Sequence, residues 1–493
     1  MGHLIHNTVI KTGFESNLFV ANSLILFYGQ LGKLESIRFL FDEMPVRNIV
    51  TWTAVISAFS QNHKFDSAIG YFREMQIEGV KPNSFTMATL LPSFCNSEEL
   101  IQIHSFLIKC GFDCDVFVST ALIDVYAKCG SIFPAQQVFN EMPERNIVSW
   151  NAMMLGYNQN GGALVSLELF AKMRRSRNVQ PDSFSVVTAL NSCSVLTTLR
   201  NGKEIHGYVY KVGLEGVVFI GNGLIDMYGK CGLLEVAERV FYEMRERDVS
   251  SWTALITCYG LHGQGAKAIS IFEEMKQTKS ITPNSVTITA ILTACSHSCL
   301  VEDGIRYFEA MTSDFGIEPT MKHYSCIVDL LGRTGFLEEA LKFIAKMPIQ
   351  ADVRLWESLL GTAVIQGDKS IAEIAAKSLI TLQSENPEVL IQLANVYAKF
   401  GRWEEVAKIR VVLCKTPGLS FDFQVCALSC WSWSPTPFNA SAFLAANAGY
   451  CSHSLCLVSE QSDEERATIR PVSLGLANLG VDFGSVVECQ DPG

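Results

Sequence analysis

The sequence lacks several features that would assign a function on their own. Its 493 residues contain 39 Lys and Arg against 50 Asp and Glu, and the net charge of −11 disfavours binding that depends mainly on neutralising phosphates. No uninterrupted apolar run approaches the roughly 20 residues that a membrane-spanning helix needs. The Cys-x-x-Cys, His-Glu-x-x-His and His-x-Glu patterns are absent, so we expect no zinc site and no other cofactor.

Disulfide bonds are not expected either, although the chain has 16 cysteines. Cys95, Cys193 and Cys295 recur 98 and 102 residues apart, and Cys129 and Cys231 recur 102 residues apart. Equivalent positions in successive repeats predict small side chains packed within helices rather than a disulfide framework. These intervals indicate an internal repeat.

Three similar stretches of 35 or 36 residues share the same intervals. Their tryptophans, Trp52, Trp150 and Trp252, lie 98 and 102 residues apart. The three stretches are Ile49–Asn83, Ile147–Asp182 and Val249–Asn284. Two other kinds of unit fill the intervals, a short one with a Tyr-x-x-x-Gly pattern and a longer one with an Ile-His pair. The chain is therefore an array of triplets, which indicates a repeat architecture.

Each unit has the pattern of two helices joined by a turn. In the first stretch, Trp52, Val55 and Phe59 fall at helical spacing, and a second helical pattern follows and ends at Gly79. A lone hairpin of this length cannot bury its apolar face, so neighbouring hairpins must stack on one another. The sequence therefore predicts an all-α fold, an α-solenoid superhelix of stacked helical hairpins.

The repeat signatures resemble those of a known family. Met-Pro pairs close short units at Met44, Met142 and Met347, and Trp-Thr-Ala or Trp-Asn-Ala opens the three stretches. With the Ile-His and Tyr-Ala-Lys-Cys-Gly signatures, these features are similar to plant pentatricopeptide repeat proteins of the PLS class, E subgroup. In that class standard (P), long (L) and short (S) repeats alternate. The S units here are Leu18–Asn48, Val116–Asn146, Val218–Asp248 and Met321–Asp352, the P units are the three stretches above, and the L units are Ser84–Asp115, Ser183–Val217 and Ser285–Thr320.

This order divides the chain into three regions. Residues 1–352 form the repeat array, which begins inside a partial L unit, so we expect upstream repeats and any transit peptide to be missing from this chain. Residues 353–413 stay helical and resemble the tetratricopeptide-like E motifs that contact proteins in this family. Residues 414–493 match neither pattern, and we expect a disordered tail or an artefact of the gene model. The first L unit is about three residues short near Asn96–Leu100, which predicts a local distortion.

The resemblance implies which side chains read an RNA base. In this family the fifth and the last residue of a unit together contact one base of single-stranded RNA. The pairs are Asn22 with Asn48, Thr53 with Asn83, Thr120 with Asn146, Asn151 with Asp182, Asn222 with Asp248, Thr253 with Asn284, and Ser325 with Asp352. By resemblance, Asn–Asp favours U, Thr–Asn favours A, Asn–Asn favours a pyrimidine (Y) and Ser–Asp favours G. Read 5′ to 3′ with L units as n, the sequence bound is Y-A-n-A-U-n-U-A-n-G. The competing interpretation is that Asn, Asp and Thr simply cap and begin helices.

Apolar residues at the second position of the units also allow two interpretations. They are Phe19, Val50, Phe117, Val148 and Phe219. These side chains could wedge between successive bases, or they could pack in the core as residues that open a helix. Ser250 occupies this position in the unit Val249–Asn284 and interrupts the pattern, so wedging between bases should be weaker there. Four lysines are expected to be solvated, with phosphate contacts as the functional alternative. They are Lys109, Lys128, Lys211 and Lys230.

We therefore expect a non-enzymatic adaptor that binds single-stranded RNA in a plant mitochondrion or chloroplast. By resemblance it marks a site of C-to-U editing, and a deaminase would be recruited in trans through residues 353–413, since the chain shows no zinc ligands or catalytic Glu. Two alternatives remain open. One is a protein-binding helical scaffold, which the acidic charge favours, and the other is a role in organelle RNA processing or stability other than editing.

Overall fold

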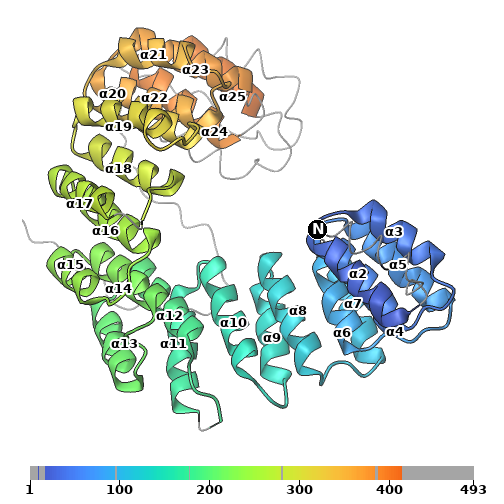
Figure 1. Cartoon of the computed structure of the whole chain (residues 1–493). Helices are drawn as coiled ribbons and strands as arrows, with labels where there is room; N and C mark the ends of the chain where they lie inside the picture. Colours follow the sequence, from blue (N-terminus) through green and yellow to red (C-terminus); the bar gives the residue numbers. More distant parts are fainter. Residues whose placement is uncertain are drawn as a thin grey trace, which may run out of the picture. The chain divides into compact units, whose positions relative to one another are not determined.

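The computed structural model describes residues 9, 17–94, 97–176, 178–278, 281–382 and 387–413. Over these residues the chain is all helical, with 24 α-helices, one 3-10 helix and no strand. Figure 1 shows the helices following one another as antiparallel pairs. The expectations for the partial first unit, Cys95 and residues 414–493 lie outside the described residues, apart from residue 9.

The first helix of each hairpin is even-numbered in Figure 1 and the second is odd-numbered. The helices are α2 (Leu18–Gln30), α3 (Leu34–Glu43), α4 (Ile49–Gln61), α5 (Phe65–Ile77), α6 (Ser84–Leu90), η2 (Leu91–Ser93), α7 (Ser97–Lys109), α8 (Val116–Lys128), α9 (Ile132–Glu141), α10 (Ile147–Gln159), α11 (Ala163–Arg175), α12 (Ser183–Leu196), α13 (Leu199–Val212), α14 (Val218–Lys230), α15 (Leu234–Glu243), α16 (Val249–Leu261), α17 (Gly265–Gln277), α18 (Ser285–His297), α19 (Val301–Ser313), α20 (Met321–Arg333), α21 (Leu337–Ala345), α22 (Val353–Gln366), α23 (Lys369–Leu382), α24 (Pro387–Lys399) and α25 (Trp403–Leu413).

The first helices form one continuous layer. Each even-numbered helix from α2 to α20 packs against the next even-numbered helix, and each except α6 also packs against its own hairpin partner. Within α4, Trp52, Val55, Ile56 and Phe59 are fully buried because neighbours lie on several sides of this helix. The second helix α5 buries a narrower stripe that includes Met75. The predicted α-solenoid is confirmed.

Every predicted unit from Leu18 onward begins on the first residue of a helix. The first L unit differs, because α6 has 7 residues whereas α12 has 14, and the chain continues as the 3-10 helix η2. Pro92 lies in η2 and has no N–H to continue the α-helical hydrogen bonds. The distortion predicted near Asn96 therefore begins at Leu91, and Pro92 explains it better than the shortened length does.

The repeated Tyr-x-x-x-Gly pattern ends the first helix of the S units. Gly130 adopts a left-handed backbone conformation with φ of 75°, and the N–H of Ser131 donates to the carbonyl of Tyr126. Glycine favours this conformation because it has no Cβ. Thr197 holds an equivalent turn in an L unit with φ of 50°, which a β-branched residue adopts at a cost.

The cysteine expectation holds only in part. Cys193 and Cys295 are fully buried inside helices, and burial raises the pKa of Cys193 to about 11 and that of Cys295 to about 12. These thiols are packing residues. Cys129 and Cys231 instead follow the last residues of α8 and α14 and are half-buried, so packing within a helix was wrong for them.

Candidate nucleic-acid interface

The last residue of each predicted pair is the N-cap of the following first helix. In every case its Oδ1 atom accepts a hydrogen bond from the backbone N–H three residues later, at 2.8 to 3.0 Å. These residues are Asn48, Asn83, Asn146, Asp182, Asp248, Asn284 and Asp352. The capping interpretation is therefore right for the last residues, and such a cap contributes about 1 kcal/mol to helix stability.

Capping leaves the other terminal atom of the side chain available. With Oδ1 bound to the helix, an Asn presents its Nδ2 donor and an Asp presents Oδ2 as an acceptor. The N3–H of uracil and the N1–H of guanine require an acceptor, whereas N1 of adenine and N3 of cytosine require a donor. A cap can thus also discriminate bases, and the two interpretations of these residues are compatible.

Two of the predicted pairs are in direct contact. The amide nitrogen of Asn151 donates to Oδ1 of Asp182 at 3.2 Å, and Asn222 donates to Asp248 at the same distance. Burial alone would raise the pKa of Asp182, but hydrogen bonds from the backbone and hydroxyl of Ser185 and from Asn151 outweigh it and lower that pKa. Both carboxylates have lowered pKa values and stay charged at neutral pH.

Two further pairs are joined through a bridging threonine. The hydroxyls of Thr53 and Thr86 lie 2.7 Å apart, and Thr86 donates to Oδ1 of Asn83 at 2.8 Å. The pair Thr253 and Asn284 is bridged in the same way through Thr287. In each bridge the hydroxyl of the fifth residue, Thr53 or Thr253, is already hydrogen-bonded. The bridging hydroxyl donates to Oδ1 of the Asn and so fixes the orientation of its amide.

No hydrogen bond joins the members of the other three pairs in the described part of the chain. The hydroxyls of Thr120 and Ser325 donate to carbonyls of their own helices, of Val116 at 2.6 Å and Met321 at 3.0 Å. Oδ1 of Asn22 is buried without a partner within the described ranges. The structure therefore links four pairs by hydrogen bonds and leaves three unlinked.

The second-position side chains are exposed, so the core-packing interpretation was wrong. Phe19 is 81% exposed and Phe117 is 70% exposed, and Val50, Val148 and Phe219 are also exposed. Sequence reasoning missed three more members in the L units, namely Phe85, Phe184 and Val286, which are exposed at the same position. Each follows an N-cap by two residues, so apolar side chains alternate along the layer with the polar pairs. Ser250 interrupts this stripe.

Three cations on the first helices of S units are paired with carboxylates. Nζ of Lys128 lies 2.6 Å from Asp124, and Lys230 lies 2.9 Å from Asp226. Arg333 pairs with Asp329 at 2.7 Å in the last S unit. Both lysines are exposed, as expected, and each also pairs with a carboxylate. These partly exposed pairs are worth at most about 1 kcal/mol each, so a phosphate could replace the carboxylate.

An arginine precedes the last residue in three S units and holds it in place. Arg145 donates to the carbonyls of Phe139 and Asn140 at 2.8 Å, and its guanidinium lies 5.0 Å from the Phe139 ring centroid. The same ring meets the edge of Trp150 at 5.0 Å. We call this set an Arg–Phe–Trp junction. The three junctions are Arg47–Phe41–Trp52, Arg145–Phe139–Trp150 and Arg247–Phe241–Trp252. In the sequence, the signal that could have revealed these junctions is the Arg directly before the last residue of the first three S units.

No candidate metal centre or membrane span is seen in the described ranges. No group of three or more His, Cys, Asp and Glu side chains there could hold a metal ion. None of the helices in that part of the chain is long and apolar enough to cross a bilayer.

Comparison with known proteins assigns the family. The PPR repeat family model matches residues 47–96 and 247–297, the PPR repeat model matches 19–49, 117–147, 148–178, 222–249 and 322–349, and the E motif model matches 366–420. A putative mitochondrial pentatricopeptide repeat-containing protein of Arabidopsis thaliana is 37% identical over 429 residues, covering 85% of this chain and 68% of the relative. The chain belongs to the pentatricopeptide repeat family. The alternating units and the E motif agree with its PLS class and E subgroup.

Other pentatricopeptide repeat proteins give the same result. The chloroplastic protein CRR2 of Arabidopsis thaliana is 38% identical over 417 residues, covering 83% of this chain and 63% of the relative. The chain spans between 50% and 68% of the length of the curated relatives it matches. The crystal structure of the pentatricopeptide repeat protein PPR10 in complex with an 18-nt psaJ RNA element shares the fold, with a TM-score of 0.62 and 18% identity over 81% of this chain and 61% of that chain.

Proposed function

We propose that this pentatricopeptide repeat protein binds single-stranded RNA in a sequence-specific manner and reads Y-A-n-A-U-n-U-A-n-G. The observation that supports it most is the direct Asn151–Asp182 and Asn222–Asp248 contact, which leaves a charged Oδ2 acceptor at each proposed uracil position. The exposed apolar stripe supplies stacking surfaces beside the polar pairs from Asn22 to Asp182, and Ser250 interrupts it after the Asn222–Asp248 pair. The RNA bound to PPR10 adds support from a protein of the same fold.

Affinity in this proposal comes mainly from the bases. The array and the E-like region together carry a net charge of −6, since residues 414–493 contribute −5 of the total of −11. Lys128, Lys230 and Arg333 are already paired with carboxylates. Because few counterions would be released from the RNA, the salt dependence of binding should be shallow.

We further propose that the protein acts in a plant mitochondrion or chloroplast as a site-recognition factor for C-to-U editing. The E motif match at 366–420 supports assigning protein contacts to residues 353–413, beyond a repeat array at 1–352. The deaminase would be a separate protein, and the edited C would lie a few nucleotides beyond the base read by Met321–Asp352. The relatives named as chloroplastic or mitochondrial support the compartment.

An unbiased RNA selection with the full chain at stated salt tests the base readout. The bound pool should be enriched in Y-A-n-A-U-n-U-A-n-G. The double variant Asn151→Thr/Asp182→Asn should change the preferred fifth base from U to A and leave the other positions unchanged. If the double variant still selects U at the fifth position, base readout by this pair is refuted.

A protein-binding scaffold is the rival function, favoured by the acidic charge of the array. A folded, helical protein that enriches no RNA sequence would support this rival and overturn the RNA proposal. If RNA is bound but no editing defect follows loss of the protein, RNA processing or stability replaces editing as its role.

A further inference from the structure

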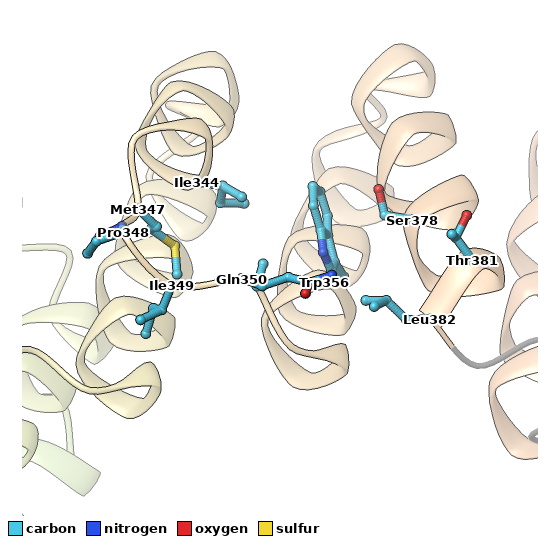
Figure 2. Close-up of a pocket in the computed structure, with 10 residues that line it drawn as sticks. Ile344, Met347, Pro348, Ile349, Gln350, Trp356, Ser378, Thr381 and Leu382 are labelled. Atoms are coloured by element: carbon cyan, nitrogen blue, oxygen red, sulfur yellow. The ribbon is translucent and has the colours of Figure 1, made fainter.

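A buried hydroxyl accompanies six of the seven proposed base-reading pairs. It belongs to the third residue of the unit that follows the pair, and these residues are fully buried. The six third-position hydroxyls are those of Thr51, Thr86, Ser149, Ser185, Ser251 and Thr287. After the seventh pair Leu355 takes this position, directly before Trp356, whose indole lines a pocket of about 470 Å³ (Figure 2). Because a fully buried hydroxyl cannot touch a base, any effect that it has on recognition must pass through the pair.

Five of the six third-position hydroxyls donate a hydrogen bond to Oδ1 of the last residue in the preceding pair. The oxygen–oxygen distances are 2.8 to 3.1 Å. The same Oδ1 atom also accepts the backbone N–H of the third residue, so two donors hold it. The other terminal atom of the side chain, Nδ2 of Asn or Oδ2 of Asp, is then fixed in direction.

Ser149 is the exception among the six. Its hydroxyl donates to the backbone carbonyl of Asn146 at 2.9 Å, and within the described hydrogen bonds only the Ser149 N–H holds Oδ1 of Asn146. The three threonines at this position all follow an Asn, whereas the other two serines follow an Asp. A carboxylate is the stronger acceptor, and the second heavy atom on the Thr Cβ leaves the hydroxyl fewer directions. A serine after a neutral Asn is therefore the combination in which the hydroxyl turns away.

Three of the third-position hydroxyls also reach the fifth residue of the pair. They join Thr86 to Thr53 at 2.7 Å, Thr287 to Thr253 at 2.8 Å and Ser185 to Oδ1 of Asn151 at 2.5 Å. The three Thr–Asn pairs of the chain thus form an internal comparison. Two of them are held through a threonine, whereas Thr120 and Asn146 are bonded separately to their own helices.

We propose, given the RNA binding proposed above, that the third residue of the following unit positions the last residue of each pair and so sets how strictly the pair selects its base. Adenine accepts a hydrogen bond at N1, which Nδ2 of Asn284 can donate, whereas guanine carries a proton at N1. To bind guanine, the Asn amide would have to turn Oδ1 outward, which breaks two hydrogen bonds at Asn284 and one at Asn146. Adenine should therefore be selected more strictly at the second and eighth positions of the RNA than at the fourth.

Affinity measurements on the full chain test this role at one RNA position at a time. The probes are RNAs of the sequence Y-A-n-A-U-n-U-A-n-G, with U at Y and at each n, and their versions with G for A at the fourth or the eighth position. Ser149→Thr should raise the preference for A over G at the fourth position about fivefold, the value of one hydrogen bond. Thr287→Val keeps the branched shape and removes the hydroxyl, so the preference at the eighth position should fall about fivefold. The Thr253 hydroxyl keeps the carbonyl of Val249 as its acceptor in this variant.

Thr293→Val is the matched control. It makes the same change in α18 at a hydroxyl that donates to the carbonyl of Thr289 rather than to a base-reading residue, so the preference at the eighth position should stay the same. If Ser149→Thr and Thr287→Val change the affinities for the A and G probes equally or not at all, the hydroxyls are only structural and the positioning role is refuted. The proposed function then still stands, because the unchanged chain prefers A. If the unchanged chain prefers no base at any position, the proposed function fails and the positioning role fails with it.

Discussion

Replacing Arg145 by Gln should release the loop that carries Asn146. The change removes one part-buried charge-assisted hydrogen bond to the carbonyl of Phe139, worth about 1.5 kcal/mol, and a partly exposed cation–π contact worth about 0.5 kcal/mol. The second hydrogen bond, to the carbonyl of Asn140, is exposed and adds little. We therefore expect local destabilisation of about 2 kcal/mol at this junction.

Hydrogen exchange measures this effect locally, which suits a repeat array whose units interact mainly with their neighbours. A loss of about 2 kcal/mol should speed exchange of the Ser149 amide about thirtyfold. Arg200→Gln is the control, because Arg200 makes only an exposed pair with Glu204 and its loss should change nothing. A less than twofold change in Arg145→Gln would refute the assigned role. If the RNA proposal holds, discrimination at the fourth base should fall while the other positions keep theirs.

Three further predictions follow from single residues. Thr197→Gly should raise stability by about 1 kcal/mol in a thermal melt, since a β-branched residue at φ of 50° is strained, and an unchanged or lower melting temperature would contradict this. Burial lowers the pKa of His206 below 6.5, against an opposing effect of Glu243, so below pH 6.5 the unfolded chain binds a proton that the folded chain does not. Stability should therefore fall as pH drops from 7 to 5, and His206→Gln should flatten that dependence in denaturation measured at each pH. Asp124→Asn should free Lys128 for phosphate, raise RNA affinity and steepen the slope of log K against log salt by up to about one unit, whereas an unchanged slope would show that the lysine does not reach the RNA.

The sequence predicted which residues form the proposed base-reading pairs, but not the contacts or the exposure of the side chains around them. It placed Asn151 and Asp182 in one pair, and the structure brings them to 3.2 Å. It could not show that Thr53 and Asn83 meet through Thr86, because that bridge depends on the distance between two stacked helices. Nor could it decide that Phe19 is exposed, since an apolar residue that opens a helix is compatible with either side of the layer.

By itself the sequence determined the hairpins and their boundaries. These depend on local chemistry, namely helical spacing of apolar residues, Asn or Asp at N-caps and Gly130-like turns, all within one unit. Only the tertiary structure decided that the Phe139 ring meets the edge of Trp150, and that a pocket is open beside Trp356. The reason is that these contacts join the end of one unit to the start of the next, so they depend on how neighbouring hairpins stack.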